Sequence, residues 1–300
     1  QKVDTEDAED LNKMFQMGFV SLEEVQEGKD KVQALKKTKS EWSVAKMPKV
    51  LAPPVPSDLQ CSSVWDQFGL SRALVAGILD MGYTNGPTMI QKEMLTNAKG
   101  RQYIVGSAPT GSGKTLAFLA DILQDISASV RPTDYRLMAL VLCPTRELAL
   151  QVADHAKRIG KYIPSLRVAT IVGGMSAEKQ QRQLSLAPTL IVATPGRLAE
   201  LAESDEEGLQ KSLKNIKYLV IDEADRMMLD KKGKFPDLES ILRHVGKDRR
   251  TFLFSATLST EKLNQAFSTL KKRLGIVKPF EIHVKASLKL DEYKVLSIDQ

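Results

Sequence analysis

Short apolar runs alternate with helix-length amphipathic segments through most of this chain, and this alternation restricts its fold more than any other feature. Strands are predicted at residues 102–107, 137–143, 167–172, 190–193, 216–221 and 251–254. Helices are predicted at residues 71–81, 88–96, 114–128, 146–159 and 176–184, and between and after the later strands. Strands that alternate with helices form a mostly parallel sheet covered on both faces, so the pattern predicts a three-layer α/β fold. Ligands of such sheets bind at the carboxyl ends of the strands.

The first 62 residues differ in composition from the rest of the chain. Residues 1–47 are rich in Glu, Asp, Lys and Gln and carry apolar residues at roughly helical spacings, which predicts a helical N-terminal extension. Residues 48–62 hold repeated prolines, which lack the amide donor and fix φ, so this segment is predicted to be an extended linker. The main domain is then expected to begin near residue 63.

Charge and cysteine content narrow the class of protein. Residues 1–60 hold 9 Lys and Arg against 11 Asp and Glu, and the other 240 residues hold 34 against 26, so a segment of charge −2 precedes a domain of charge +8. A moderately basic domain suits a polyanionic partner, and a merely soluble surface explains the positive charge equally well.

Cys61 and Cys143 form neither a disulfide framework nor a metal site, which favours a reducing intracellular compartment. No apolar run approaches the ~18 residues of a membrane helix.

A glycine-rich loop follows the predicted strand at residues 102–107 and precedes an apolar helix, which is the context of a phosphate-binding loop. The loop reads Ala108-Pro109-Thr110-Gly111-Ser112-Gly113-Lys114-Thr115. Its glycines let backbone amides turn inward on an anion, and the helix N-terminus adds partial positive charge. Lys114 is predicted to reach the β- and γ-phosphates and Thr115 to bind Mg²⁺. The general pattern has glycine at the position of Ala108, and a chance flexible turn is the alternative.

Two carboxylates follow the predicted strand at residues 216–221. Asp222 is placed to hold Mg²⁺, in part through water, and Glu223 is placed to polarise an attacking water as a general base. The alternative is an acidic first turn of a helix, where Asp and Glu are favoured. The presence of a phosphate loop in the same chain favours the catalytic interpretation.

These residues resemble a known family. Asp222-Glu223-Ala224-Asp225 is the motif that names the DEAD-box helicases, and the chain resembles the first RecA-like domain of that family over about residues 63–285. The other motifs follow in order: motif I at residues 108–115, motif Ia at 144–148, the GG element at Gly173-Gly174, motif Ib at 194–197 and motif III at Ser255-Ala256-Thr257. Alanine is usual in the family at the position of Ala108.

A Q motif is the upstream part of the resemblance. Gly82-Tyr83 and Pro87-Thr88-Met89-Ile90-Gln91 resemble it, with Trp65 where the family has an upstream Phe. Three residues separate Tyr83 from Pro87, where the family has two. An amide such as that of Gln91 can pair with adenine, which would favour ATP over GTP. The alternative for Gln91 is an exposed helix residue.

The resemblance implies an ATP-dependent RNA helicase that couples ATP hydrolysis to local RNA unwinding or to remodelling of RNA–protein particles, with ribosome assembly among the candidate processes. It implies a nucleotide site formed by Trp65, Tyr83, Gln91, Ala108, Pro109, Thr110, Gly111, Ser112, Gly113, Lys114 and Thr115. Glu223, Asp222 and Lys114 would be catalytic, and Thr115 and Asp222 would hold Mg²⁺. Asp225, Ser255 and Thr257 would couple the ATP site to domain closure.

RNA would be held by its sugar-phosphate backbone, because short loops and arginines offer donors to phosphates without reading bases. The resemblance assigns this contact to Pro144, Thr145, Arg146, Gly174, Thr194, Pro195, Gly196 and Arg197. The alternatives are a helix N-terminal residue for Arg197 and a carboxylate partner, such as Glu147, for Arg146. The family's second RecA-like domain supplies further arginines to the γ-phosphate. Only 43 residues follow Thr257, so residues 286–300 are expected to begin the interdomain linker and the second domain to be absent.

Two other functions remain open from the residues alone. The first is a phosphate-loop ATPase that acts on DNA or protein, because no residue visibly reads a 2′-hydroxyl. The second is a non-catalytic assembly factor of an RNA–protein particle, against which the intact set of catalytic residues argues.

Overall fold

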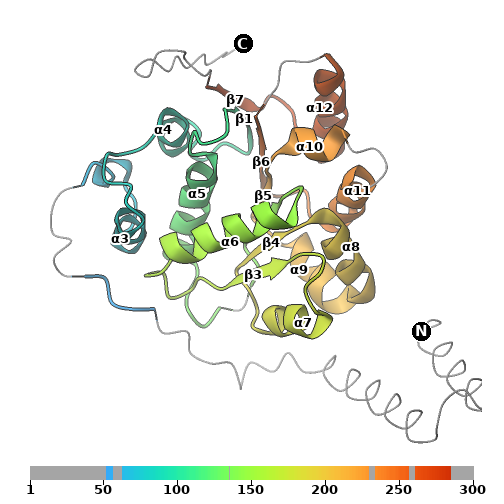
Figure 1. Cartoon of the computed structure of the whole chain (residues 1–300), viewed down its shortest axis with the longest axis horizontal. Helices are drawn as coiled ribbons and strands as arrows, with labels where there is room; N and C mark the ends of the chain where they lie inside the picture. The colour runs from blue at the N-terminus through green and yellow to red at the C-terminus, as the bar shows by residue number, and fades with distance from the viewer. Residues whose placement is uncertain (1–51, 57–62, 135, 230–233, 257–260, 285–300) are drawn as a thin grey trace, which may run out of the picture. The chain divides into compact units, whose positions relative to one another are not determined.

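A computed structural model of the chain describes residues 52–56, 63–134, 136–229, 234–256 and 261–284 (Figure 1). The predicted N-terminal helices at residues 1–47, most of the predicted linker, Thr257 and residues 286–300 lie outside the described residues. Contacts divide the chain into residues 1–48 and a second unit, residues 49–300, to which everything below belongs. No helix in the described ranges is long and apolar enough to cross a membrane.

The described part of the second unit is built on a seven-stranded sheet in the order β3-β4-β2-β5-β6-β1-β7. Every strand pair in it is parallel, as the alternating pattern predicted. The strands are β1 (Tyr103–Ser107), β2 (Ala139–Leu142), β3 (Val168–Ile171), β4 (Leu190–Ala193), β5 (Tyr218–Ile221), β6 (Arg250–Ser255) and β7 (Phe280–His283). Four of the predicted strands are one to three residues shorter in the structure, β4 has the predicted bounds, and β6 is two residues longer.

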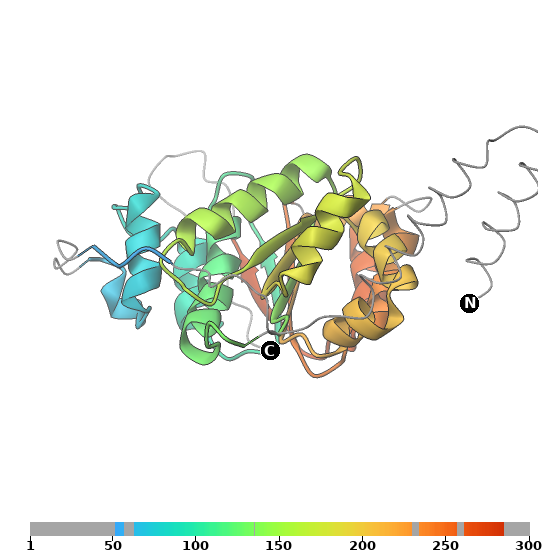
Figure 2. The same cartoon turned by 90° about the horizontal axis from the view of Figure 1, so that it is seen from below.

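Helices cover both faces of the sheet, so the three-layer prediction is confirmed (Figures 1 and 2). One core packs against α3 (Arg72–Asp80), α4 (Met89–Thr96), α5 (Lys114–Ser129) and α6 (Arg146–Ile159). The other packs against α7 (Ala177–Ser185), α8 (Pro195–Ser204), η3 (Glu206–Gln210), α9 (Lys211–Lys214), α10 (Ala224–Leu229), α11 (Lys234–His244) and α12 (Glu261–Leu274). Strand β2 shows the alternation: Ala139 and Val141 face the first core, and Leu140 and Leu142 face the second.

Strand β6 lies between β5 and β1, although its residues follow those of β1 by almost 150 positions. Thr251 pairs with Tyr103 and Ser255 with Ser107. A Cβ atom on Gly106 would lie 2.4 Å from the Phe254 ring, so this glycine allows the close approach of the two strands. The carboxyl ends of β5, β6 and β1 are therefore neighbours, which brings the segments after residues 107, 221 and 255 to one edge.

Helix α3 is fixed against the end of α6. A Cβ atom on Gly77 would lie 1.8 Å from the carbonyl oxygen of Ile159, so only glycine allows this helix contact. The Asp80 carboxylate accepts a hydrogen bond of 2.6 Å from the Tyr162 hydroxyl and lies 3.1 Å from Nζ of Lys161. These contacts hold the segment that leads into Tyr83.

Candidate functional site

The glycine-rich loop joins the end of β1 to the start of α5. Gly111 and Gly113 have φ of 82° and 92°, in the left-handed region that favours glycine. The Ala108 amide donates to the Ser255 carbonyl oxygen at 3.2 Å, and Ala108 is buried. The position of Ala108 is therefore a packed one on the side of β6, and alanine fits it.

Lys114 folds back over this loop. Its ammonium donates to the carbonyl oxygens of Ala108 and Pro109, the latter at 2.9 Å. Burial lowers the pKa of Lys114, and the nearby carboxylates of Asp222 and Glu223 oppose that shift. The two loop carbonyls thus hold the Lys114 ammonium close to the place where a phosphate would bind.

The loop fits a phosphate. The Ser112 hydroxyl oxygen is buried without a hydrogen-bond partner among the described residues. A Cβ atom built on Gly111 meets nothing within 4 Å, so the space beside the loop is open. A loop with open space beside it, a buried hydroxyl without a described partner and a lysine at the start of a 16-residue helix are features that a phosphate site requires.

The two carboxylates follow β5 directly. Asp222 is only 3% exposed, and burial raises its pKa to about 6 although its Oδ1 accepts the Glu223 amide at 3.0 Å. Glu223 has φ of 48°, which is uncommon for a residue with a side chain. Its Oε2 lies 3.0 Å from Nη1 of Arg226, an exposed residue on α10. The buried acid suits a metal ligand, and the half-buried acid beside it can accept a proton from water.

Gln91 ties α4 to the phosphate loop. It is 1% exposed, so the alternative of an exposed helix residue is wrong. Its Oε1 accepts the Thr88 amide at 2.9 Å, and its Nε2 donates to the Gly113 carbonyl oxygen at 3.1 Å. The Thr88 hydroxyl adds a bond of 2.8 Å to the Ser112 carbonyl oxygen. Thr88, which the sequence did not single out as a site residue, is part of this link.

Trp65 does not have the predicted direct role. It is fully buried in the first core, so it offers no surface to a nucleotide ring. Its Nε1 donates to the Tyr83 carbonyl oxygen at 2.7 Å, while Tyr83 itself is partly exposed. An indole ring packs well in an apolar core, but its N–H needs a hydrogen-bond partner, and this placement provides both. Trp65 therefore positions the Tyr83 segment, and stacking by Tyr83 remains a prediction.

The residues predicted to bind RNA follow three adjacent strands. Pro144, Thr145 and Arg146 follow β2, Gly174 follows β3, and residues 194–197 follow β4. Nη1 of Arg146 donates to the Gly173 carbonyl oxygen at 3.0 Å, so the GG element, and not Glu147, is its partner in the structure. Arg197 lies in the first turn of α8 and pairs with Glu200 at 2.7 Å.

Gln180 connects two of these loops and carries no sequence signal, because it lies among other polar residues of α7. It is fully buried. Its Nε2 donates to the Met175 carbonyl oxygen at 2.8 Å, and its Oε1 accepts from Nε of Arg197 at 3.4 Å. The loop after β3 and the loop after β4 are thereby joined through one side chain.

Two of the three predicted coupling residues are described. Both are buried: Asp225 lies in the first turn of α10, just after β5, and Ser255 ends the neighbouring strand β6. The Ser255 carbonyl accepts the Ala108 amide, which places Ser255 beside the phosphate loop. The hydrogen bond between them, and the role of Thr257, remain predictions.

Comparison with known proteins identifies the family of this site. The model of the DEAD/DEAH box helicase domain matches residues 88–266. The ATP-dependent rRNA helicase rrp-3 of Neurospora crassa is 43% identical over 209 residues, which cover 70% of this chain and 38% of that protein. The ATP-dependent RNA helicase mak5 of Schizosaccharomyces pombe is 41% identical over 217 residues, which cover 71% and 32%. The chain thus spans about a third of the length of these relatives.

Solved structures show the same fold. A DEAD box protein from Methanococcus jannaschii superposes with a TM-score of 0.59 at 34% identity, covering 72% of this chain and 55% of that one. Dbp5 of S. cerevisiae, bound to RNA and ADP BeF3, superposes with a TM-score of 0.59 at 28% identity, covering 73% and 51%. The predicted RecA-like fold is confirmed, and the chain belongs to the DEAD/DEAH box helicase family.

Proposed function

We propose that this chain is the ATP-binding half of an ATP-dependent RNA helicase that remodels RNA–protein particles inside the cell. One observation carries the proposal: the order β5-β6-β1 brings Lys114, Asp222 and Glu223 to one edge of the sheet, beside a loop shaped for phosphate. The structure of Dbp5 bound to RNA and ADP BeF3 supports the nucleotide class, and the rRNA helicase named among the relatives supports the substrate class. Ribosome assembly is the process that the relatives' names favour.

Each residue of the ATP site has a role in this proposal. Lys114 leaves the Ala108 and Pro109 carbonyls and pairs with the β- and γ-phosphates. Thr115 and Asp222 hold Mg²⁺, which neutralises charge on the phosphate oxygens when it is bound. Glu223 accepts the proton of the attacking water. Gln91 and Tyr83 contact the adenine.

The RNA surface is proposed at the loops after β2, β3 and β4, whose donors suit phosphates. The list of contacts is Pro144, Thr145, Arg146, Gly174, Thr194, Pro195, Gly196 and Arg197. In the structure the two arginines are held by the Gly173 carbonyl and by Glu200, and RNA phosphate would replace those acceptors. A second RecA-like domain would complete the ATP site and the RNA site. Asp225, Ser255 and Thr257 would couple ATP binding to closure of the interface between the two domains.

The test is ATP turnover by the protein joined to a second RecA-like domain, measured with RNA and with DNA of the same sequence. We expect stimulation by RNA and little by DNA. Arg146→Ala should weaken RNA binding and reduce its salt dependence, because one phosphate contact is lost. The exposed Lys272→Ala, in the last turn of α12, is the matched control. Equal stimulation by DNA would refute the RNA assignment, and turnover that neither polymer changes would refute the helicase function.

A further inference from the structure

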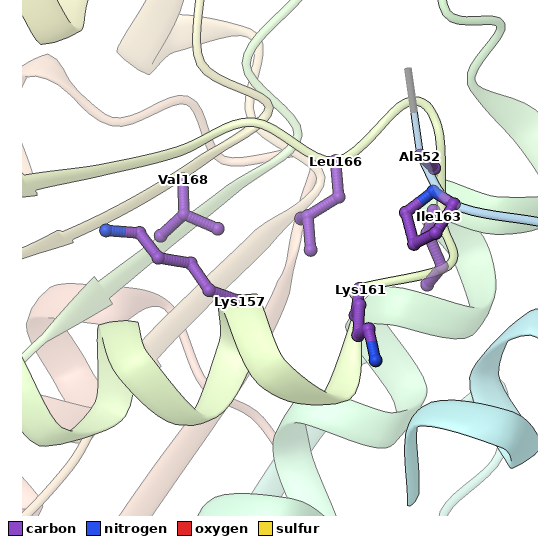
Figure 3. A pocket seen from close by; sticks show the side chains of 8 residues that line it. Ala52, Lys157, Lys161, Ile163, Leu166 and Val168 are labelled. Carbon is purple, nitrogen blue, oxygen red and sulfur yellow. The ribbon is translucent and has the colours of Figure 1, made fainter. Parts of the chain in front are cut away.

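A small pocket lies at the amino edge of the sheet, where α6 ends and β3 begins (Figure 3). Its volume is about 160 Å³. Ala52 forms one wall, and the other lining residues used below are Lys157, Lys161, Ile163, Leu166 and Val168. Helix α6 starts beside the proposed RNA loops and ends at this pocket, so the pocket lies at the opposite end of α6 from those loops.

The pocket lining combines apolar side chains with two lysines. The side chains of Ile163, Leu166 and Val168 supply an apolar surface. Among the described residues that line the pocket, the titratable ones are two exposed lysines, Lys157 and Lys161, and none is a carboxylate. An apolar cavity of about 150 Å³ can hold a molecule as large as benzene, so this pocket has room for one aliphatic side chain.

Lys161 has a carboxylate partner outside the pocket. Its Nζ lies 3.1 Å from Oδ2 of Asp80, and the same oxygen accepts the Tyr162 hydroxyl at 2.6 Å. Both members of the ion pair are substantially exposed, with side chains 51% and 37% accessible. Exposed pairs of this kind are weak, so a second carboxylate that approaches from the pocket can take the lysine while Tyr162 still holds Asp80.

We propose that this pocket docks a segment of a partner protein in which an aliphatic residue is flanked by carboxylates. The aliphatic side chain fills the pocket against Leu166 and Val168, and the carboxylates pair with Lys157 and Lys161. A single-stranded nucleic acid fits less well, because none of the described residues that line the pocket has an aromatic ring to stack a base. The position of the pocket lets a partner bind without covering the loops that hold ATP and RNA, and the inference does not depend on the proposed function.

The test uses methyl-labelled protein of residues 1–300 and the probe peptide acetyl-Ser-Glu-Leu-Glu-Ser-amide, observed by methyl NMR. We expect saturable shifts at the methyl groups of Ile163, Leu166 and Val168, weakened by salt. Replacing the glutamates of the peptide by lysine, or its leucine by serine, should abolish them. Lys157→Glu should weaken binding about two- to fivefold, the range that an exposed ion pair supplies. Lys272→Glu, the same charge change far from the pocket, should not.

Asp80→Asn is the decisive variant. It removes the carboxylate that competes for Lys161 and leaves an oxygen for the Tyr162 hydroxyl, so the peptide should bind about two- to fivefold more tightly. Unchanged or weaker binding by this variant would overturn the proposal, as would shifts spread over other methyl groups. Shifts of the same methyl groups by an oligouridylate, or by raising the concentration of the peptide-free protein, would indicate RNA or a second copy as the occupant and would also overturn it.

Discussion

The side-chain amide of Gln91 lies 3.1 Å from the carbonyl oxygen of Gly113, so a residue of α4 is bonded to the phosphate loop itself. A Cβ atom on Gly113 would lie 2.2 Å from the same nitrogen, which shows how closely the two segments meet. The start of α4 and the phosphate loop are therefore linked through one buried side chain.

In the proposed complex the Gln91 amide exchanges its bonds to Thr88 and Gly113 for bonds to adenine. Gln91→Ala is then expected to weaken ATP binding by about 1–3 kcal/mol, the value of one bidentate amide–adenine contact. It should also reduce the preference for ATP over GTP. Competition binding with labelled nucleotides measures both. Lys92→Ala, an exposed neighbour on α4, serves as the control. Equal affinity of the unmutated protein for ATP and GTP would contradict adenine recognition by this residue.

Glu223→Gln should preserve binding of Mg-ATP and abolish nearly all turnover, because the change removes the proton acceptor and keeps the shape. Lys114→Ala should instead weaken binding, since a phosphate loses its cationic partner. The measurements are nucleotide affinity and single-turnover hydrolysis in the protein joined to a second domain. Hydrolysis at the unmutated rate by the Glu223→Gln variant would show that another group is the base.

Asp222 should make the nucleotide-free and metal-free protein less stable as the pH rises. Its pKa is about 6 in the folded chain against ~3.9 for an ordinary aspartate, so the folded state binds more protons between these values. Stability is expected to fall as the pH rises from about 4 to 6, and the loss persists above it.

Asp222→Asn removes that titration and should stabilise the protein by about 3 kcal/mol at pH 7.5 and little at pH 4. Urea unfolding at several pH values tests this, with the exposed Asp248→Asn as the matched control. A gain of equal size at both pH values would contradict the assignment. Mg-ATP should reverse the order of stability at pH 7.5, because it stabilises only the protein that retains the carboxylate.

Gly77→Ala should destabilise the fold by about 1–3 kcal/mol or more, because its Cβ would overlap the backbone carbonyl of Ile159. Gly173→Ala is the control, since a Cβ there meets nothing within 4 Å. Thermal unfolding compares the two. Equal melting temperatures for both variants would mean that α3 does not pack on α6 as described.

The chain of residues 1–300 alone should bind Mg-ATP weakly and hydrolyse it very slowly. Arginines that reach the γ-phosphate contribute a factor of about 10³–10⁵ in related nucleotidases, and the proposal assigns them to a second domain. A steady-state ATPase assay with and without RNA measures whether residues 1–300 alone turn over ATP. RNA-stimulated turnover at ordinary enzyme rates would show that the site is complete within these residues.

Local patterns predicted the strands and helices well, because each carries its own periodicity and boundary residues. The exact bounds of α6 and β4 were predicted, and Lys114, Asp222 and Glu223 lie at strand or helix ends as expected. Tertiary placement was not predictable in the same way. The sequence placed the Trp65 ring near adenine, but in the structure this ring lies in the core. The polar side chains of Gln91 and Gln180 are buried because they form hydrogen bonds with backbone groups of other segments.

The place of β6 in the sheet also affects when the ATP site can form while the chain is being synthesised on the ribosome. The strand that leads into the phosphate loop is made early, but its neighbour on the side of β5 is Arg250–Ser255, and Ala108 bonds to Ser255. Contacts so distant in sequence form late and slow the folding of a domain. A nascent chain that stops before residue 250 holds the whole phosphate loop and both carboxylates proposed to be catalytic, but it lacks the strand that lies between β5 and β1. We therefore expect it to bind ATP only after β6 has entered the sheet.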